Sequence, residues 1–218
     1  MIRYLPLIVG IAPLIGVTMA YWLNVRADVL PSCIPYIDGC TSISATGRYM
    51  PGSMVFRAVL LPQAAFMTVL WWFSVEWLRE VSPTSRASKA ILLFGFTGAV
   101  ALIVYVSYLG TKEPFYEFLR RFGIYLYFLG TALAQILLTL AMTRSRLRNT
   151  MLLVISMPFV LGVTNLLLKL IMDDSNTIEN SIEWISALLM QGWFVLLYVA
   201  WRGSGLTVTV RTDSSNAR

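Results

Sequence analysis

Six long apolar stretches constrain the fold of this chain more than any other feature of its sequence. A helix needs about 20 mostly apolar residues to cross the hydrocarbon core of a bilayer. Runs of that length, bounded by charged residues or by Pro and Gly, predict six spanning helices. These runs cover residues 5–23, 54–78, 90–109, 122–143, 150–172 and 182–201. We therefore predict an all-α polytopic membrane protein with a single six-helix bundle over residues 1–203.

The composition favours the same fold class. Of the 218 residues, 57% are hydrophobic and 13% are charged, and the mean hydropathy is +0.71. A soluble domain has roughly 25% charged residues. The connections between the runs are short, except for residues 24–53, which we predict to form an extracytoplasmic cap loop. Residues 204–218 are predicted to be a disordered cytoplasmic tail.

The distribution of Lys and Arg predicts the orientation, because short loops rich in these residues stay in the cytoplasm. Both termini, with the second and fourth connections, hold ten basic residues: Arg3, Arg79, Arg86, Lys89, Arg144, Arg146, Arg148, Arg202, Arg211 and Arg218. The remaining connections hold five: Arg26, Arg48, Lys112, Arg120 and Arg121. Both termini are therefore expected in the cytoplasm. The net charge of +6 indicates contact with anionic lipid head groups, and not with nucleic acid.

Residues 1–24 also fit a second interpretation, a cleaved signal peptide, because Arg3 precedes an apolar run. The run is longer than the apolar region of a typical signal peptide, and Tyr21 and Trp22 are typical of an interfacial anchor. The sequence therefore favours a retained first helix.

Both cysteines, Cys33 and Cys40, fall in the long first loop. Outside the cytoplasm a disulfide can form and persist. Pro35 and Gly39 lie between the two cysteines and allow the chain to turn back, which predicts a Cys33–Cys40 bond. Two unpaired thiols remain the alternative. A metal site is not predicted, since two Cys supply too few of the usual four ligands.

The chain contains no His. This excludes Ser-His-Asp and Cys-His catalysis and His-ligated zinc sites. We predict no cofactor, no bound metal and no catalytic residue. Any chemistry would depend on carboxylates, Lys, Tyr, Ser or Thr.

Polar side chains at membrane depth are candidates to line a cavity. They are Gln63, Gln135, Asn165, Lys169 and Gln191. Gln135 stands in an i, i+4, i+8 stripe with Thr131 and Thr139, and Asn165 and Lys169 stand in a second stripe with Asp173. Such stripes either bond to neighbouring helices or face a ligand. Both interpretations stay open.

Four arginines at the predicted outer face are candidates to bind a lipid head group: Arg48, Arg57, Arg120 and Arg121. A guanidinium group can grip a phosphate through two hydrogen bonds. Acidic residues assigned to the same face, including Glu117 and Glu183, offer an alternative in which they neutralise the arginines. The two interpretations are evenly matched.

Residues 112–122 alternate charged and apolar side chains between the third and fourth runs. Phe115, Phe118, Leu119 and Phe122 follow helical spacing. This pattern predicts a short amphipathic helix that lies in the membrane interface before the fourth span.

Two adjacent motifs precede the second run: residues 43–47 read Ile-Ser-Ala-Thr-Gly, and residues 51–56 read Pro-Gly-Ser-Met-Val-Phe. They resemble the Ile-Ser-Asp-Thr-Gly and Pro-Glu-Ser-x-x-Phe signature of the six-helix family of damage-regulated autophagy modulators and FRAG/SFK-type proteins of GPI-lipid remodelling. Further matches, at Leu5-Pro6, at Pro35-Tyr36-Ile37 and at Phe128, Gly130 and Gln135, extend the resemblance over most of residues 1–143. The resemblance implies six helices, cytoplasmic termini and a role in lipid remodelling or lipid-linked regulation.

The chain departs from this signature at its ionisable positions. Ala45 replaces Asp, Gly52 replaces Glu, and Arg120 stands in place of a His. No catalytic role can therefore be carried over from the family. The matching cap motif residues are turn-forming and packing residues: Ser44, Thr46, Gly47, Pro51 and Phe56. Gly47 and Gly52 can take φ > 0, and we predict that residues 42–53 fold into a compact plug.

These observations predict a protein that binds or handles membrane lipid in a cavity beneath the cap, with the head group held by the arginines. One alternative is a non-enzymatic scaffold or regulatory subunit that binds a protein partner in the membrane. Another is an acyltransferase-like lipid-remodelling enzyme that uses a carboxylate or a hydroxyl.

Overall fold

The computed structural model describes residues 2–82, 86–171 and 176–204, and every regular element within these ranges is a helix. Six helices are long: α1 (Leu5–Arg26), α4 (Gly52–Val81), α5 (Ser88–Ser107), α6 (Pro114–Ala141), α7 (Arg146–Ile171) and α8 (Asn176–Gly203). Three are short: η1 (Ile2–Tyr4), α2 (Pro35–Asp38) and α3 (Ile43–Thr46). The predicted tail beyond residue 204 lies outside the described residues.

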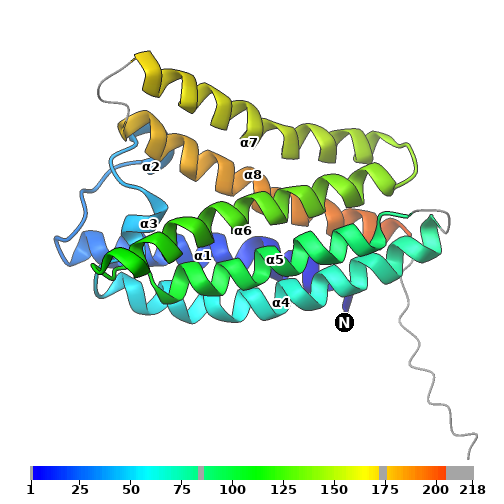
Figure 1. The fold of residues 1–218 in the computed structure, drawn as a ribbon, viewed down its shortest axis with the longest axis horizontal. Helices are drawn as coiled ribbons and strands as arrows, with labels where there is room; N and C mark the ends of the chain where they lie inside the picture. Colours follow the sequence, from blue (N-terminus) through cyan, green and yellow to red (C-terminus); the bar gives the residue numbers. More distant parts are fainter. Residues whose placement is uncertain (1, 83–85, 172–175, 205–218) are drawn as a thin grey trace, which may run out of the picture.

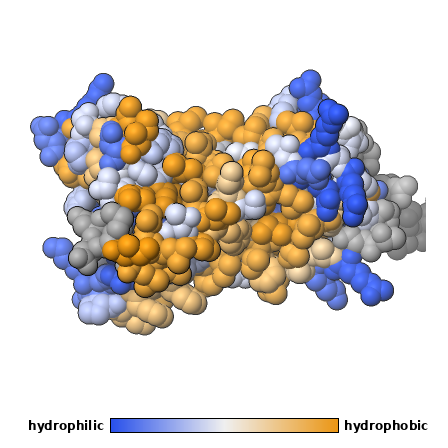
Figure 2. All heavy atoms as spheres, turned by 90° about the horizontal axis from the view of Figure 1, so that it is seen from above, coloured by the Kyte–Doolittle hydropathy of each residue, from blue (hydrophilic) through white to orange (hydrophobic). Residues whose placement is uncertain are grey.

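The six long helices are long and apolar enough to cross a membrane. Figure 2 shows an apolar band around the middle of the visible face, with hydrophilic side chains gathered at both ends. This distribution matches a bilayer, whose hydrocarbon core excludes exposed polar groups. The chain is an all-α polytopic integral membrane protein, which confirms the predicted fold class.

The long helices form a ring in which each helix contacts the next, in the order α1, α4, α5, α6, α7, α8 and back to α1. Neighbours in this ring run antiparallel (Figure 1). Helices α2 and α3 lie at the end of the bundle where α1, α5 and α7 finish and α4, α6 and α8 begin. We call this the cap end, and we call residues 27–51 the cap segment.

Helix α6 begins earlier than the sequence predicted. The separate interfacial helix expected over residues 112–122 is wrong, because α6 runs without a break from Pro114 to Ala141. Pro114 suits the first turn of a helix, where its missing N–H is not needed. Tyr116 in this first turn stacks on Tyr108 at the end of α5, with ring centroids 5.0 Å apart. The amphipathic segment is therefore the first two turns of a spanning helix.

Helices α5 and α6 pack closely because glycines stand at their contact. A Cβ atom added to Gly130 would lie 2.8 Å from the carbonyl oxygen of Phe94, and one added to Gly123 would lie 2.9 Å from the backbone nitrogen of Tyr105. Gly98 faces Thr131 equally closely. Small residues let spanning helices approach backbone to backbone, where van der Waals packing holds them together.

Aromatic side chains fill the centre of the ring. Trp71 of α4 packs against both Trp193 and Phe194 of α8, with ring centroids 6.2 and 5.9 Å away, and all three are fully buried. Gly95 of α5 faces the Trp71 indole and leaves no room for a side chain. Rings at these separations add to the packing energy of their buried area.

Helix α7 is the least buried of the six. In its most hydrophobic 18-residue window only 11% of the residues are buried, against 33–44% in the other five helices. Figure 1 shows α7 diverging from α6 towards the cap end, although the two helices meet at the opposite end. There the Arg148 guanidinium donates from Nε to the Thr139 carbonyl oxygen at 3.0 Å.

The cap segment is attached to α1, α4 and α8. Asn24 of α1 is fully buried, donates to the Thr46 carbonyl oxygen and accepts from the Gly52 N–H, each at 2.9 Å. The Trp184 indole of α8 donates to the Thr41 carbonyl oxygen at 2.9 Å. These bonds satisfy irregular backbone that would otherwise be costly to bury near a membrane.

Candidate functional site

A groove of about 530 Å³ opens between α6, α7 and α8. Its walls are mainly apolar and include Phe128 and Leu129 of α6 and Phe159 and Leu166 of α7. Gly162 faces the same space, and a Cβ atom added there would meet nothing within 4 Å. The groove exists because α7 diverges from α6 while staying in contact with α8.

Among the described residues that line this groove, Glu183 is the one with an acidic side chain. Its carboxylate oxygen Oε1 accepts hydrogen bonds from the backbone N–H and the hydroxyl of Ser44, at 3.4 and 3.5 Å. The Ser44 hydroxyl also lies 3.0 Å from the hydroxyl of Tyr105. The cap segment thus contacts the acidic residue of the groove directly.

A second, enclosed cavity of about 50 Å³ lies beneath the cap segment. Tyr36 and Ile43 of the cap segment line it, together with Tyr127 and Gln191 and with Glu183, which faces both spaces. Partial burial raises the pKa of the Tyr36 phenol, so this side chain is neutral. A cavity of this size holds a few water molecules but no lipid head group. The larger space opens sideways between helices, and not beneath the cap as the sequence predicted.

Two of the four candidate arginines come together. Arg48 and Arg120 line a separate polar groove of about 560 Å³ at the cap end, which Lys112 and Glu117 also line. Arg120 is held there by Glu117, whose carboxylate lies 3.4 Å away, and its side chain is only 14% exposed.

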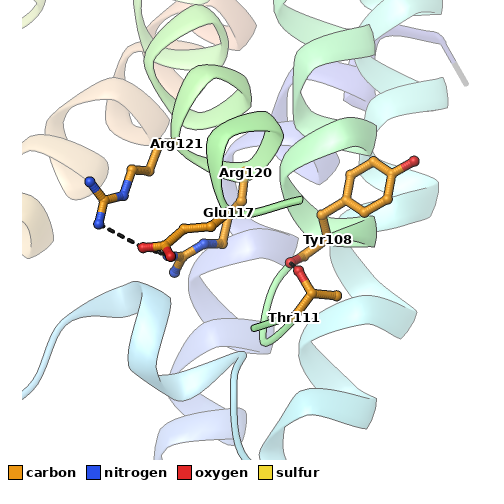
Figure 3. Close-up of polar contacts among 5 residues, drawn as sticks. All are labelled: Tyr108, Thr111, Glu117, Arg120 and Arg121. Carbon is orange, nitrogen blue, oxygen red and sulfur yellow. Dashed lines mark hydrogen bonds and ion pairs between the residues drawn. The ribbon is translucent and has the colours of Figure 1, made fainter. Parts of the chain in front are cut away.

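The other two arginines have different partners. Arg121 forms an ion pair with Glu117 at 2.6 Å and is 68% exposed, and Figure 3 shows both arginines of this segment converging on that one carboxylate. Arg57 donates to the Leu109 carbonyl oxygen at 2.7 Å and caps the end of α5. The acidic residue Glu117 therefore partly neutralises this face, as one of the two sequence-based interpretations required.

The predicted cavity-lining glutamines mostly bond between helices. Gln63 donates to the Val9 carbonyl oxygen at 2.7 Å, and Gln135 donates to the Met190 carbonyl oxygen at 3.0 Å. Gln191 donates to the Tyr127 hydroxyl at 3.1 Å and also faces the enclosed cavity. Of the two interpretations, hydrogen bonding to a neighbouring helix is therefore the one that holds for Gln63 and Gln135.

Of the candidates on α7, the structure describes the side chain of Asn165. Asn165 has a buried side-chain oxygen, Oδ1, without a hydrogen-bond partner among the described residues. The side chain of Lys169 and the whole of Asp173 lie outside the described residues.

The cap motif residues act as packing and turn residues. Thr46 donates to the Ile43 carbonyl oxygen at 2.7 Å, and Phe56 is fully buried and lines the enclosed cavity. Pro51 immediately precedes α4. Gly47 has φ −90° and Gly52 lies in α4, so neither adopts the left-handed conformation that glycine permits. A Cβ atom added to Gly47 would lie 2.6 Å from the Phe56 ring, which makes Gly47 a close-packing residue.

The left-handed glycine of the cap segment is Gly39, with φ +56° at the end of α2. It lies against the backbone of Thr177 in α8, which leaves no room for a side chain. The disulfide joins Cys33 and Cys40 around this turn, with their Cα atoms 6.6 Å apart. The Tyr21 hydroxyl accepts from the Cys33 N–H at 2.9 Å and ties the turn to α1.

Glu183 was not among the residues that the sequence analysis assigned to the site. The apolar run predicted a helix beginning at residue 182, which placed Glu183 at its very end, in contact with water. The helix begins at Asn176, so Glu183 lies two turns inside it. A carboxylate within the first turns of an apolar span was the available signal.

A scan of the sequence against protein-family models and searches of curated proteins and of solved structures found no match. Within the part of the chain that the structure describes, no three His, Cys, Asp or Glu side chains gather in a way that could hold a metal ion. The fold and the site together define an integral membrane protein with a lateral, mainly apolar groove.

Proposed function

We propose that this protein binds a membrane lipid, and that the site is the groove between α6, α7 and α8. The observation that carries the proposal is the groove itself, about 530 Å³ of mainly apolar space between three membrane-spanning helices. Its volume falls within the range of about 300–1,000 Å³ that is typical of small-molecule sites.

The surroundings of the groove favour a lipid as its occupant. In a bilayer the molecules next to α6, α7 and α8 are lipids, and an acyl chain fills apolar space that water would leave empty. The walls made by Phe128, Leu129, Phe159 and Leu166 offer it dispersion contacts. The resemblance of the cap motif to FRAG/SFK-type proteins of GPI-lipid remodelling supports the same assignment.

The ends of the helices indicate where the head group would lie. Helix α8 has 28 residues, which at about 1.5 Å per residue exceeds the hydrocarbon core of about 30 Å. Its first turns therefore reach the level of the lipid head groups. Glu183, two turns into α8, and Ser186, about one turn further, line the groove just below this level.

Filling the groove tests the proposal. The substitution Gly162→Phe directs a ring into the groove, because a Cβ atom at Gly162 meets nothing within 4 Å. The matched control is Gly192→Phe on α8, because a Cβ atom at Gly192 also meets nothing within 4 Å and Gly192 does not line the groove. Native mass spectrometry of the proteins purified in a mild non-ionic detergent then counts the lipids that remain bound.

We expect the wild type and Gly192→Phe to retain lipid, and Gly162→Phe to lose it. Wild-type protein that carries no lipid, or Gly162→Phe protein that keeps as much lipid as the wild type, would contradict the proposal.

A further inference from the structure

Glu183 stands two turns into α8, where the groove approaches the head-group level, and it faces both the groove and the enclosed cavity. Ser186 lies three residues further along α8 and lines the same groove. Residues three apart share a helix face, so the carboxylate and the hydroxyl offer hydrogen-bond acceptors to one ligand.

The partners of Glu183 within the described residues are neutral. The N–H and the hydroxyl of Ser44 lie 3.4 and 3.5 Å from Oε1, and the backbone N–H of Ile43 also donates to the carboxylate. The salt bridges among the described residues join Glu76 to Arg79 and Glu117 to Arg120 and Arg121. The described side chains around the groove include no Lys or Arg.

A carboxylate in such surroundings is costly to keep ionised unless a proton or a cation neutralises it. Transfer of a charged group away from water is strongly unfavourable when the charge is not paired. Phe128 and Met190, which line both spaces with Glu183, give the carboxylate an apolar environment. An ammonium group that entered along the groove would supply both the missing charge and strong hydrogen-bond donors.

We propose that the groove selects an amphiphile whose head group carries a protonated primary amine, and that Glu183 binds this amine while the apolar tail lies along α6 and α7. The inference rests on the proposed function, because the same groove holds the tail. Ser186 accepts a second hydrogen bond from the ammonium group. An amphiphile with an alcohol or a carboxylate in place of the amine lacks the charge that Glu183 attracts.

The test compares three probes with the same tail: dodecylamine, dodecanol and dodecanoate. Native mass spectrometry of the full-length protein in non-ionic detergent measures the affinity of each probe. We expect the wild type to bind dodecylamine most tightly and dodecanoate least tightly. The substitution Glu183→Gln keeps the shape and an acceptor for Ser44, and we expect it to weaken dodecylamine binding by about tenfold or more while leaving dodecanol unchanged.

Two further variants separate charge from structure. Ser44→Ala removes the hydroxyl that contacts Oε1 but keeps the backbone N–H at position 44 and the negative charge of Glu183, so the preference for dodecylamine should persist. Lys169→Gln should not weaken dodecylamine binding, because Glu183 determines the preference for the amine. Thermal unfolding of every variant shows whether the bundle remains folded.

The outcomes distinguish this inference from the proposed function. If Gly162→Phe abolishes binding of all three probes while Glu183→Gln leaves the preference for dodecylamine intact, the groove binds lipid but the amine assignment is wrong. If Gly162→Phe leaves binding of all three probes unchanged, both are wrong. Loss of the preference in Ser44→Ala or Lys169→Gln would also overturn the role of Glu183.

Discussion

Helix α6 contacts α5 on one side and α7 on the other. Glycine allows close packing at the first contact and leaves open space at the second. At Gly130 a Cβ atom would lie 2.8 Å from the backbone of α5, whereas at Gly162 on α7 it would meet nothing within 4 Å. The first glycine permits close packing, and the second leaves space. One helix thus takes part both in a close backbone contact and in the lateral groove.

The difference shows that one ring of spanning helices can combine a closed side with an open side. Backbone contact between α5 and α6 fixes the ring, because tightly packed interiors resist small displacements. Helix α7 is held by α8 and by the end of α6. Low burial along a helix is a mark of lower local stability, so motion is expected on the α7 side.

The strongest test of this comparison places leucine at each of the two glycines. Gly130→Leu forces α5 and α6 apart, and we expect it to lower the free energy of unfolding by about 3 kcal/mol or more, or to prevent folding. Gly162→Leu enters open space and should stay within about 0.5 kcal/mol of the wild type. Thermal or denaturant unfolding in detergent, followed by tryptophan fluorescence, measures both. Equal losses of stability would show that the α7 side is packed as tightly as the α5 side.

A second test concerns the hydrogen bonds by which Asn24 of α1 holds the cap segment and the start of α4. Asn24→Ala leaves the Thr46 carbonyl oxygen and the Gly52 N–H without their buried partner, which should cost about 1–3 kcal/mol of stability. The control is Asn149→Ala on the exposed surface of α7, which should change little. The same unfolding assay applies. An Asn24→Ala protein as stable as the wild type would show that the cap segment contributes nothing to the closed side.

The smallest expected effect is at Arg148, which holds α7 to α6. Arg148→Ala removes the bond to Thr139 and should reduce global stability by no more than about 1.5 kcal/mol. We expect it to speed amide hydrogen exchange in α7 while leaving exchange in α5 unchanged. Mass spectrometry of exchange in detergent resolves the two helices. Faster exchange in α5 as well would mean that the two sides unfold together.

The site was less predictable than the fold. Charge counting placed Arg48, Arg57, Arg120 and Arg121 on one face, but their partners depended on which backbone and acidic groups came near each one. Gln63 and Gln135 were recognised as polar side chains at membrane depth, yet only the packed helices show that carbonyl oxygens of α1 and α8 accept their hydrogen bonds. Glu183 was overlooked because an apolar run locates the centre of a spanning helix better than its ends.

The sequence alone determined that this chain spans a membrane six times. Apolar length is a local property, and the cost of exposing polar groups to hydrocarbon translates it directly into spanning helices. The tertiary structure decided how the helices meet: that α5 and α6 touch at their glycines, that α7 diverges, and that Glu183 faces the resulting groove. These features depend on packing between distant residues, because apolar side chains are interchangeable in their preference for lipid but differ in the shapes that fit together.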